Sequence, residues 1–111
     1  MPVEAYLSED RFKKEFERVF QRLPLGLALS VEFPDPGSYM ARNILGKPVL
    51  LTRDSGGEVR AFLNVCRHRG AIVCPEGSGN RSRFTCPYHS WTYSAKGDLI
   101  RVHEAETFGE V

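Results

Sequence analysis

Two short stretches of this sequence stand out from the rest: Cys66–Gly70, with the sequence CRHRG, and Cys86–Trp91, with the sequence CPYHSW. Each contains one cysteine followed by one histidine, as Cys-x-His in the first stretch and Cys-x-x-His in the second. Thiolates and imidazoles are the usual ligands of zinc and of iron–sulfur clusters. The pattern therefore predicts one metal centre with four ligands: Cys66, His68, Cys86 and His89.

The arrangement of the predicted ligands favours an iron–sulfur cluster over zinc. Zinc fingers with two cysteines and two histidines group their ligands by type, whereas each stretch here supplies one of each. That order suits a two-iron cluster in which one iron takes both cysteines and the other takes both histidines. Zinc remains the alternative occupant at this point.

Outward from these stretches, the chain alternates between short β-type runs and turn signals. Asp54–Gly57 predicts a hairpin loop, because its glycines adopt positive φ without strain. Several short strands at close spacing predict a mainly β fold, a small antiparallel sandwich or barrel. The predicted strands are Ser38–Ile44, Pro48–Arg53, Glu58–Val65, Arg81–Thr85, Trp91–Ser94 and Leu99–Val102.

An amphipathic helix is predicted over Ser8–Leu23, ahead of the strands. Its apolar residues recur at helical spacing, and Ser8 suits the N-cap position. We expect this apolar stripe to pack on the body of the domain. The chain then divides into an N-terminal helix and lead-in, 1–37, and a cluster-binding domain, 38–111. The stripe consists of Phe12, Phe16, Val19, Phe20 and Leu23.

Composition limits the other possibilities. A chain of 111 residues with 41% hydrophobic residues suits one globular domain. The net charge of +1 gives no general attraction to nucleic acid, and no apolar run is long enough for a membrane span. The N-terminus lacks a secretory signal, and three cysteines argue against a disulfide framework. We therefore expect a reducing, cytoplasmic location.

The stretches Phe62–Ala71, Phe84–Tyr93 and Gly97–Leu99 together resemble one known family. They are similar to the Rieske [2Fe–2S] domain, specifically the N-terminal domain of the large (α) subunit of aromatic-ring-hydroxylating oxygenases. The resemblance implies a Rieske-type β fold preceded by one helix and one [2Fe–2S] cluster. It also implies that Cys66 and Cys86 bind the inner iron, and His68 and His89 the outer one.

The resemblance also implies the surroundings of the cluster. Respiratory Rieske proteins carry an extra disulfide, and this chain has Ala71 and Tyr88 at those positions. With fewer groups supporting the reduced form, the potential is expected toward the bottom of the roughly −150 to +300 mV Rieske range. Ser90 stands where the family has glycine, and it would crowd the turn if its φ is positive. The expected surrounding residues are Arg67, Arg69, Gly70, Tyr88, Ser90 and Trp91.

Several other residues near the two stretches have predicted places. Cys74 is expected to be a buried thiol, and Trp91 and Tyr93 are expected to cover the cluster. His103 is expected at the surface. The basic residues Arg67, Arg69 and Arg83 suit either a solvated face or a docking surface for an acidic electron donor.

By resemblance, the chain relays single electrons from a ferredoxin or reductase to a mononuclear non-haem Fe(II). That iron is held by two histidines and a carboxylate in a separate catalytic domain, contributed by the neighbouring subunit of a trimer. Only His103 remains after the cluster, so these 111 residues cannot supply the second site. We expect an oxygenase fragment, most simply of a dioxygenase. A free-standing Rieske ferredoxin is the alternative, and a cluster-free domain is disfavoured because all four ligands are present.

Overall fold

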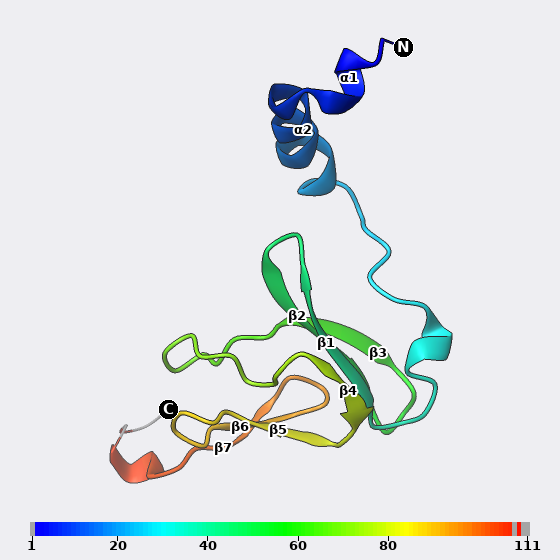
Figure 1. Cartoon of the computed structure of the whole chain (residues 1–111). Coiled ribbons are helices and arrows are strands. Elements are labelled where there is room, and N and C mark those ends of the chain that lie inside the picture. Colours follow the sequence, from blue (N-terminus) through cyan, green and yellow to red (C-terminus); the bar gives the residue numbers. More distant parts are fainter. Residues whose placement is uncertain (1, 108, 110–111) are drawn as a thin grey trace.

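The computed structural model describes residues 2–107 and 109, and in this part of the chain seven strands form two antiparallel sheets (Figure 1). The first sheet has the order β3-β2-β1-β4 and the second has the order β5-β6-β7. The first contains β1 (Ser38–Ile44), β2 (Lys47–Arg53), β3 (Val59–Leu63) and β4 (Gly77–Asn80). The second contains β5 (Arg83–Thr85), β6 (Thr92–Ser94) and β7 (Leu99–Arg101).

The two sheets share one apolar core. Tyr39 of β1 meets Phe84 of β5 edge to face, with ring centroids 5.4 Å apart. A buried hydrogen bond also joins the sheets, since the Thr52 hydroxyl donates to the Ala95 carbonyl at 2.7 Å. The core includes all three cysteines, and its buried members are Tyr39, Ala41, Leu50, Cys66, Val73, Cys74, Phe84, Cys86, Trp91 and Ala95.

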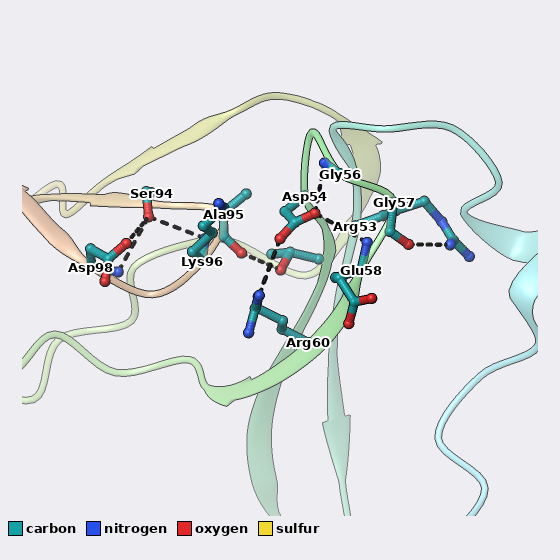
Figure 2. A network of polar contacts seen from close by, with 11 residues as sticks. Arg53, Asp54, Gly56, Gly57, Glu58, Arg60, Ser94, Ala95, Lys96 and Asp98 are labelled. Atoms are coloured by element: carbon teal, nitrogen blue, oxygen red, sulfur yellow. Dashed lines mark hydrogen bonds and ion pairs between the residues drawn. The ribbon is translucent and has the colours of Figure 1, made fainter.

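A polar network fixes the loop between β2 and β3 (Figure 2). The Asp54 carboxylate accepts hydrogen bonds from the backbone N–H groups of Gly56 and Glu58 at 2.8 and 3.1 Å. It also forms an ion pair with Arg60 at 3.2 Å. These contacts satisfy a carboxylate whose residue is only 3% exposed. The predicted hairpin loop at Asp54–Gly57 is thereby confirmed, with Gly57 at φ 85°.

The mainly β class is confirmed, as two sheets rather than a closed barrel. The six predicted strands are all present. β1 has the predicted bounds and β2 begins one residue earlier, whereas the other four are one to three residues shorter than expected. The prediction missed β4, whose sequence GSGN has low strand propensity. Close packing explains its second glycine, because a Cβ at Gly79 would lie 2.9 Å from the Tyr39 ring.

The N-terminal helical segment is present but does not pack as expected. It consists of α1 (Glu4–Leu7), α2 (Glu9–Glu15) and the π-helical turn η1 (Phe16–Phe20). Ser8 caps α2 as predicted, since its hydroxyl accepts the Arg11 N–H at 3.3 Å. These elements bury none of their residues, and Phe12 remains 62% exposed.

The prediction that the apolar stripe packs on the body is therefore wrong. The extended stretch after η1 carries the helical segment away from the sheets (Figure 1). The radius of gyration is 17.8 Å, against about 13 Å for a compact chain of this length. The helical pattern specified an apolar face, but not a partner for it.

The chain rejoins the body before β1. Leu27 and Ala28 pack against a small cluster formed by Phe33, Met40 and Leu51. The 3₁₀ turns η2 (Ser30–Glu32) and η3 (Ala105–Thr107) lie before β1 and after β7. The division into 1–37 and 38–111 stays a prediction, and Phe108, Glu110 and Val111 at its end lie outside the described residues. Among the described helices, none has the length and apolarity needed to span a membrane.

Candidate metal centre

The two predicted metal-binding stretches form loops of the same shape. Loop 1 is Cys66–Ala71, after β3, and loop 2 is Cys86–Trp91, between β5 and β6. In loop 1 the Cys66 N–H donates to the Ala71 carbonyl at 2.7 Å, and the Gly70 N–H donates to the Cys66 carbonyl at 2.8 Å. Loop 2 repeats this pattern between Cys86 and Trp91 at 2.8 Å and between Ser90 and Cys86 at 3.0 Å. Each loop thus presents its cysteine and histidine from a matching turn.

Both cysteines lie at the inner side of the loops. Cys66 is 3% exposed and Cys86 is 2% exposed. The Tyr93 hydroxyl lies 3.3 Å from the Cys66 sulfur and accepts the Arg67 N–H at 3.0 Å. Because the oxygen accepts from Arg67, its own hydrogen is available to the sulfur. Burial and this contact raise the pKa of Tyr93 to about 12, so the hydroxyl keeps its proton.

The surroundings of Cys66 favour its thiolate. Burial is the largest influence and raises the pKa of the thiol. Hydrogen bonds from the Tyr93 hydroxyl, the His68 N–H, the Cys86 side chain and the Arg69 N–H together outweigh burial, and they lower this pKa below its ordinary value. The thiolate is the form that binds a metal.

The two histidines face each other at the outer side of the loops. Their ring centroids are 4.7 Å apart, and both residues are half-buried. The Trp91 ring stacks on His68 at 4.9 Å, and the Tyr88 ring lies 3.8 Å from His89. Burial, followed by the positive charges of His89 and Arg69, lowers the pKa of His68. A neutral imidazole is again the form that a metal requires.

These groups fit a cluster with two irons. The buried Nδ1 of His89 has no hydrogen-bond partner among the described residues, which suits a nitrogen that binds a metal. The two thiols form one pair and the two imidazoles form another. Two sulfur and two nitrogen donors, paired by type, match the Rieske ligand set.

Comparison with protein families agrees with this geometry. Residues 25–109 match the model of the Rieske [2Fe–2S] domain. The chain belongs to this family. Proteins of the Rieske family carry a [2Fe–2S] cluster, so the cofactor expected from the sequence is confirmed at the level of the family.

Related Rieske proteins are oxygenase subunits. The chain is 42% identical over 104 residues to the chlorobenzene dioxygenase subunit alpha of Cupriavidus sp. (strain PS12). It is 40% identical to the benzene 1,2-dioxygenase subunit alpha of Pseudomonas putida. Both alignments cover 93% of this chain and 23% of the relative, so the chain spans about a quarter of their length.

Solved structures show the same Rieske fold. A naphthalene 1,2-dioxygenase with indole in its active site matches with a TM-score of 0.81 at 36% identity, over 93% of this chain and 23% of that one. The quaternary ammonium Rieske monooxygenase CntA matches with a TM-score of 0.85 at 31% identity, over 100% of this chain and 31% of that one. The match to CntA therefore includes the N-terminal helical segment.

The other residues expected around the Rieske centre are also placed. Arg67, Arg69 and Arg83 are exposed, as either a solvated face or a docking surface requires. Cys74 is fully buried and His103 is at the surface, as predicted. Ser90 has a φ of 59°, so the crowded conformation considered from the sequence is the one adopted.

Two contributions could not be found from the sequence. The Tyr93 hydroxyl contacts the Cys66 sulfur, whereas the sequence indicated only that Tyr93 covers the cluster. The Asn64 side chain bonds the backbone of Cys74, ten residues along the chain. A local pattern gives no signal for either contact.

Proposed function

We propose that Cys66, His68, Cys86 and His89 hold the [2Fe–2S] cluster of this Rieske domain. The cysteines bind the inner iron because they are almost fully buried, and the half-buried histidines bind the outer one. The observation that carries this assignment is the pair of matching loops, which brings two thiols and two imidazoles together. A cluster with these ligands takes up and releases one electron at a time.

We propose further that the chain serves as the electron relay of an aromatic-ring-hydroxylating oxygenase α subunit. Its dioxygenase relatives are α subunits, and the alignments include most of the N-terminal segment that a minimal ferredoxin would not need. The electron acceptor in this proposal is a mononuclear non-haem iron in the catalytic domain of a neighbouring subunit. A ferredoxin or reductase is the donor.

The residues around the two loops have different roles in the proposed electron relay. Trp91 and Tyr88 pack against the two imidazoles and fix their ring planes toward the outer side of the domain. Tyr93 holds the buried sulfur of Cys66. The exposed Arg67, Arg69 and Arg83 supply positive charge beside the centre, which would speed the approach of an acidic donor. Three free cysteines agree with a reducing compartment, which we propose to be the cytoplasm.

Metal content tests the ligand assignment. Protein reconstituted without oxygen should contain two irons and two sulfides per chain, and its reduced form should give a rhombic electron paramagnetic resonance signal. Cys86→Ala and His89→Ala should abolish this signal. Cys74→Ala and His103→Ala are matched controls and should keep it. Stoichiometric zinc without sulfide, or loss of the signal in the controls alone, would contradict the assignment.

The donor surface is tested by reduction kinetics. Stopped-flow reduction by a ferredoxin should slow as salt rises and should slow again in Arg69→Gln. Arg18→Gln, in the helical segment that stands away from the sheets, is the matched control. A rate that is indifferent to both salt and Arg69 would remove the docking surface.

The reading frame after Val111 tests the choice between relay and free carrier. A frame that continues into a segment with two histidines and a carboxylate able to bind iron supports the oxygenase. A stop codon directly after Val111 favours the free-standing ferredoxin.

A further inference from the structure

The two cluster loops are closed at their bases in different ways. Loop 2 is closed by the β5–β6 ladder, in which Thr85 pairs with Thr92 and Phe84 pairs with Tyr93. In loop 1 the first of these pairs has a counterpart, the isolated bridge between Val65 and Ile72. The second pair would have its counterpart at Asn64. The described structure has no strand pair at that position, and the Asn64 side chain makes a contact there instead.

The Asn64 side chain takes the place of this missing pair. Its Nδ2 donates to the Cys74 carbonyl at 2.6 Å, and its Oδ1 accepts the Cys74 N–H at 3.0 Å. A carboxamide has the donor and the acceptor of a peptide group, so it reproduces both bonds of a ladder pair. We call these two bonds the Asn64 clamp. Within the described residues, no other side-chain hydrogen bond joins residues 64–65, before loop 1, to residues 72–74, after it.

The clamp is buried and is tied to the first sheet. Asn64 is 3% exposed and Cys74 is 0% exposed, so water cannot replace either bond. The backbone N–H of Asn64 donates to the Pro48 carbonyl of β2 at 2.9 Å. The clamp therefore links β2, the start of loop 1 and the segment that follows loop 1.

We propose that Asn64 is a positioning residue of the metal centre, which holds loop 1 closed so that Cys66 and His68 face loop 2. This proposal rests on the proposed function for its effect on the cluster, but not for the clamp itself. Without the side chain, the buried N–H and C=O of Cys74 would both lack partners. The base of loop 1 would then be held by one isolated bridge, whereas loop 2 would keep its ladder.

The test compares two variants that each remove a buried side-chain contact to the backbone. Asn64→Leu removes the clamp at nearly constant volume. Thr52→Val removes the buried bond from the Thr52 hydroxyl to the Ala95 carbonyl, away from loop 1. Iron release to a chelator should be roughly 10- to 100-fold faster in Asn64→Leu, since each unpartnered buried group favours opening. The principal g values should also change in Asn64→Leu and stay unchanged in Thr52→Val.

Equal iron release and identical g values in the two variants would overturn the proposal. A second measurement needs no variant and covers the case in which Asn64→Leu does not fold. In unaltered protein, the Cys74 amide should be protected from hydrogen exchange at least as strongly as the Cys66 and Gly70 amides. If Cys74 exchanged about tenfold faster than those amides, the clamp would open while loop 1 stayed closed, and the proposal would fail.

The same exchange measurement separates this proposal from the proposed function. It can be made on protein with and without iron. Failure to assemble a [2Fe–2S] cluster would refute the proposed function, while the protection of Cys74 in iron-free protein would still decide whether Asn64 closes loop 1.

Discussion

Ser90 occupies a backbone conformation that favours glycine, and its replacement should stabilise the domain. Its φ is 59°, and its N–H donates to the Cys86 carbonyl. Gly70 holds the equivalent place in loop 1, with a φ of 69° and the equivalent bond to the Cys66 carbonyl. The two loops therefore provide a paired experiment, Ser90→Gly and Gly70→Ser.

The size of the effect follows from two opposing contributions. A left-handed conformation costs an ordinary L-residue roughly 1–2 kcal/mol. Glycine gains freedom in the unfolded chain, which costs the fold about 0.5–1 kcal/mol. Ser90→Gly should thus stabilise by about 0.5–1 kcal/mol. Gly70→Ser should destabilise by about the same amount, because a Cβ at Gly70 would meet nothing within 4 Å and only the backbone conformation matters.

Urea unfolding of iron-free and cluster-loaded protein measures these differences. A change of about 0.5–1 kcal/mol should move the midpoint by up to about 1 M at the usual slope for a small domain. Ser82→Gly is the control, since Ser82 is exposed and is not among the described residues with positive φ. It should lower the midpoint. If Ser90→Gly lowered it as well, the argument from backbone strain would be refuted.

Three further predictions concern a hydrogen bond, an acid and the lead-in segment. Tyr93→Phe should lower the midpoint potential by up to about 60 mV, because it removes a hydrogen-bond donor that stabilises the extra negative charge of the reduced centre at sulfur. A redox titration measures this change, and the control Tyr88→Phe should leave the potential unchanged. Burial raises the pKa of Asp54, but hydrogen bonds from Glu58, Gly56 and Arg60 outweigh it and lower that pKa overall. Its contribution to stability is therefore present above the unfolded value of about 3.9 and is lost as the pH falls through the lowered folded value. Asp54→Asn should flatten acid unfolding of iron-free protein below about pH 4, and an unchanged acid transition would contradict this. A chain beginning at residue 38 loses the buried ring of Phe33. Urea unfolding should show it to be about 2 kcal/mol less stable than a chain beginning at residue 25. Equal stability of the two chains would show that the lead-in segment does not stabilise the fold.

Patterns that repeat along the chain predicted most of the β framework. The strand at Ser38–Ile44 has the predicted bounds, and the hairpin loop at Asp54–Gly57 has the predicted glycine conformation. Both features depend on residues that are close together in the sequence. The strand at Gly77–Asn80 was missed because its place depends on the Tyr39 ring packing over Gly79, forty residues away along the chain.

The candidate centre shows the same division between local and distant contacts. The four proposed ligands are visible in the sequence because each loop carries its own cysteine and histidine. The Asn64 clamp and the contact from Tyr93 to Cys66 join residues 10 and 27 positions apart, and neither produces a periodic signal. The apolar stripe around Phe12 marks the opposite case, since its spacing is clear but the described body offers it no partner.

The position of the two loops links cluster binding to the stability of the fold. Loop 1 follows β3, an edge strand of the first sheet, whereas loop 2 lies within the second sheet, between β5 and β6. Ligands drawn from both loops would join the two sheets through the metal centre, in addition to the shared core and the bond from Thr52 to Ala95. Because a metal site formed only in the folded state adds its binding free energy to folding, the cluster should stabilise the packing of one sheet on the other. Under the proposed ligand assignment, the buried thiols Cys66 and Cys86 would serve both electron transfer and the joining of the two sheets.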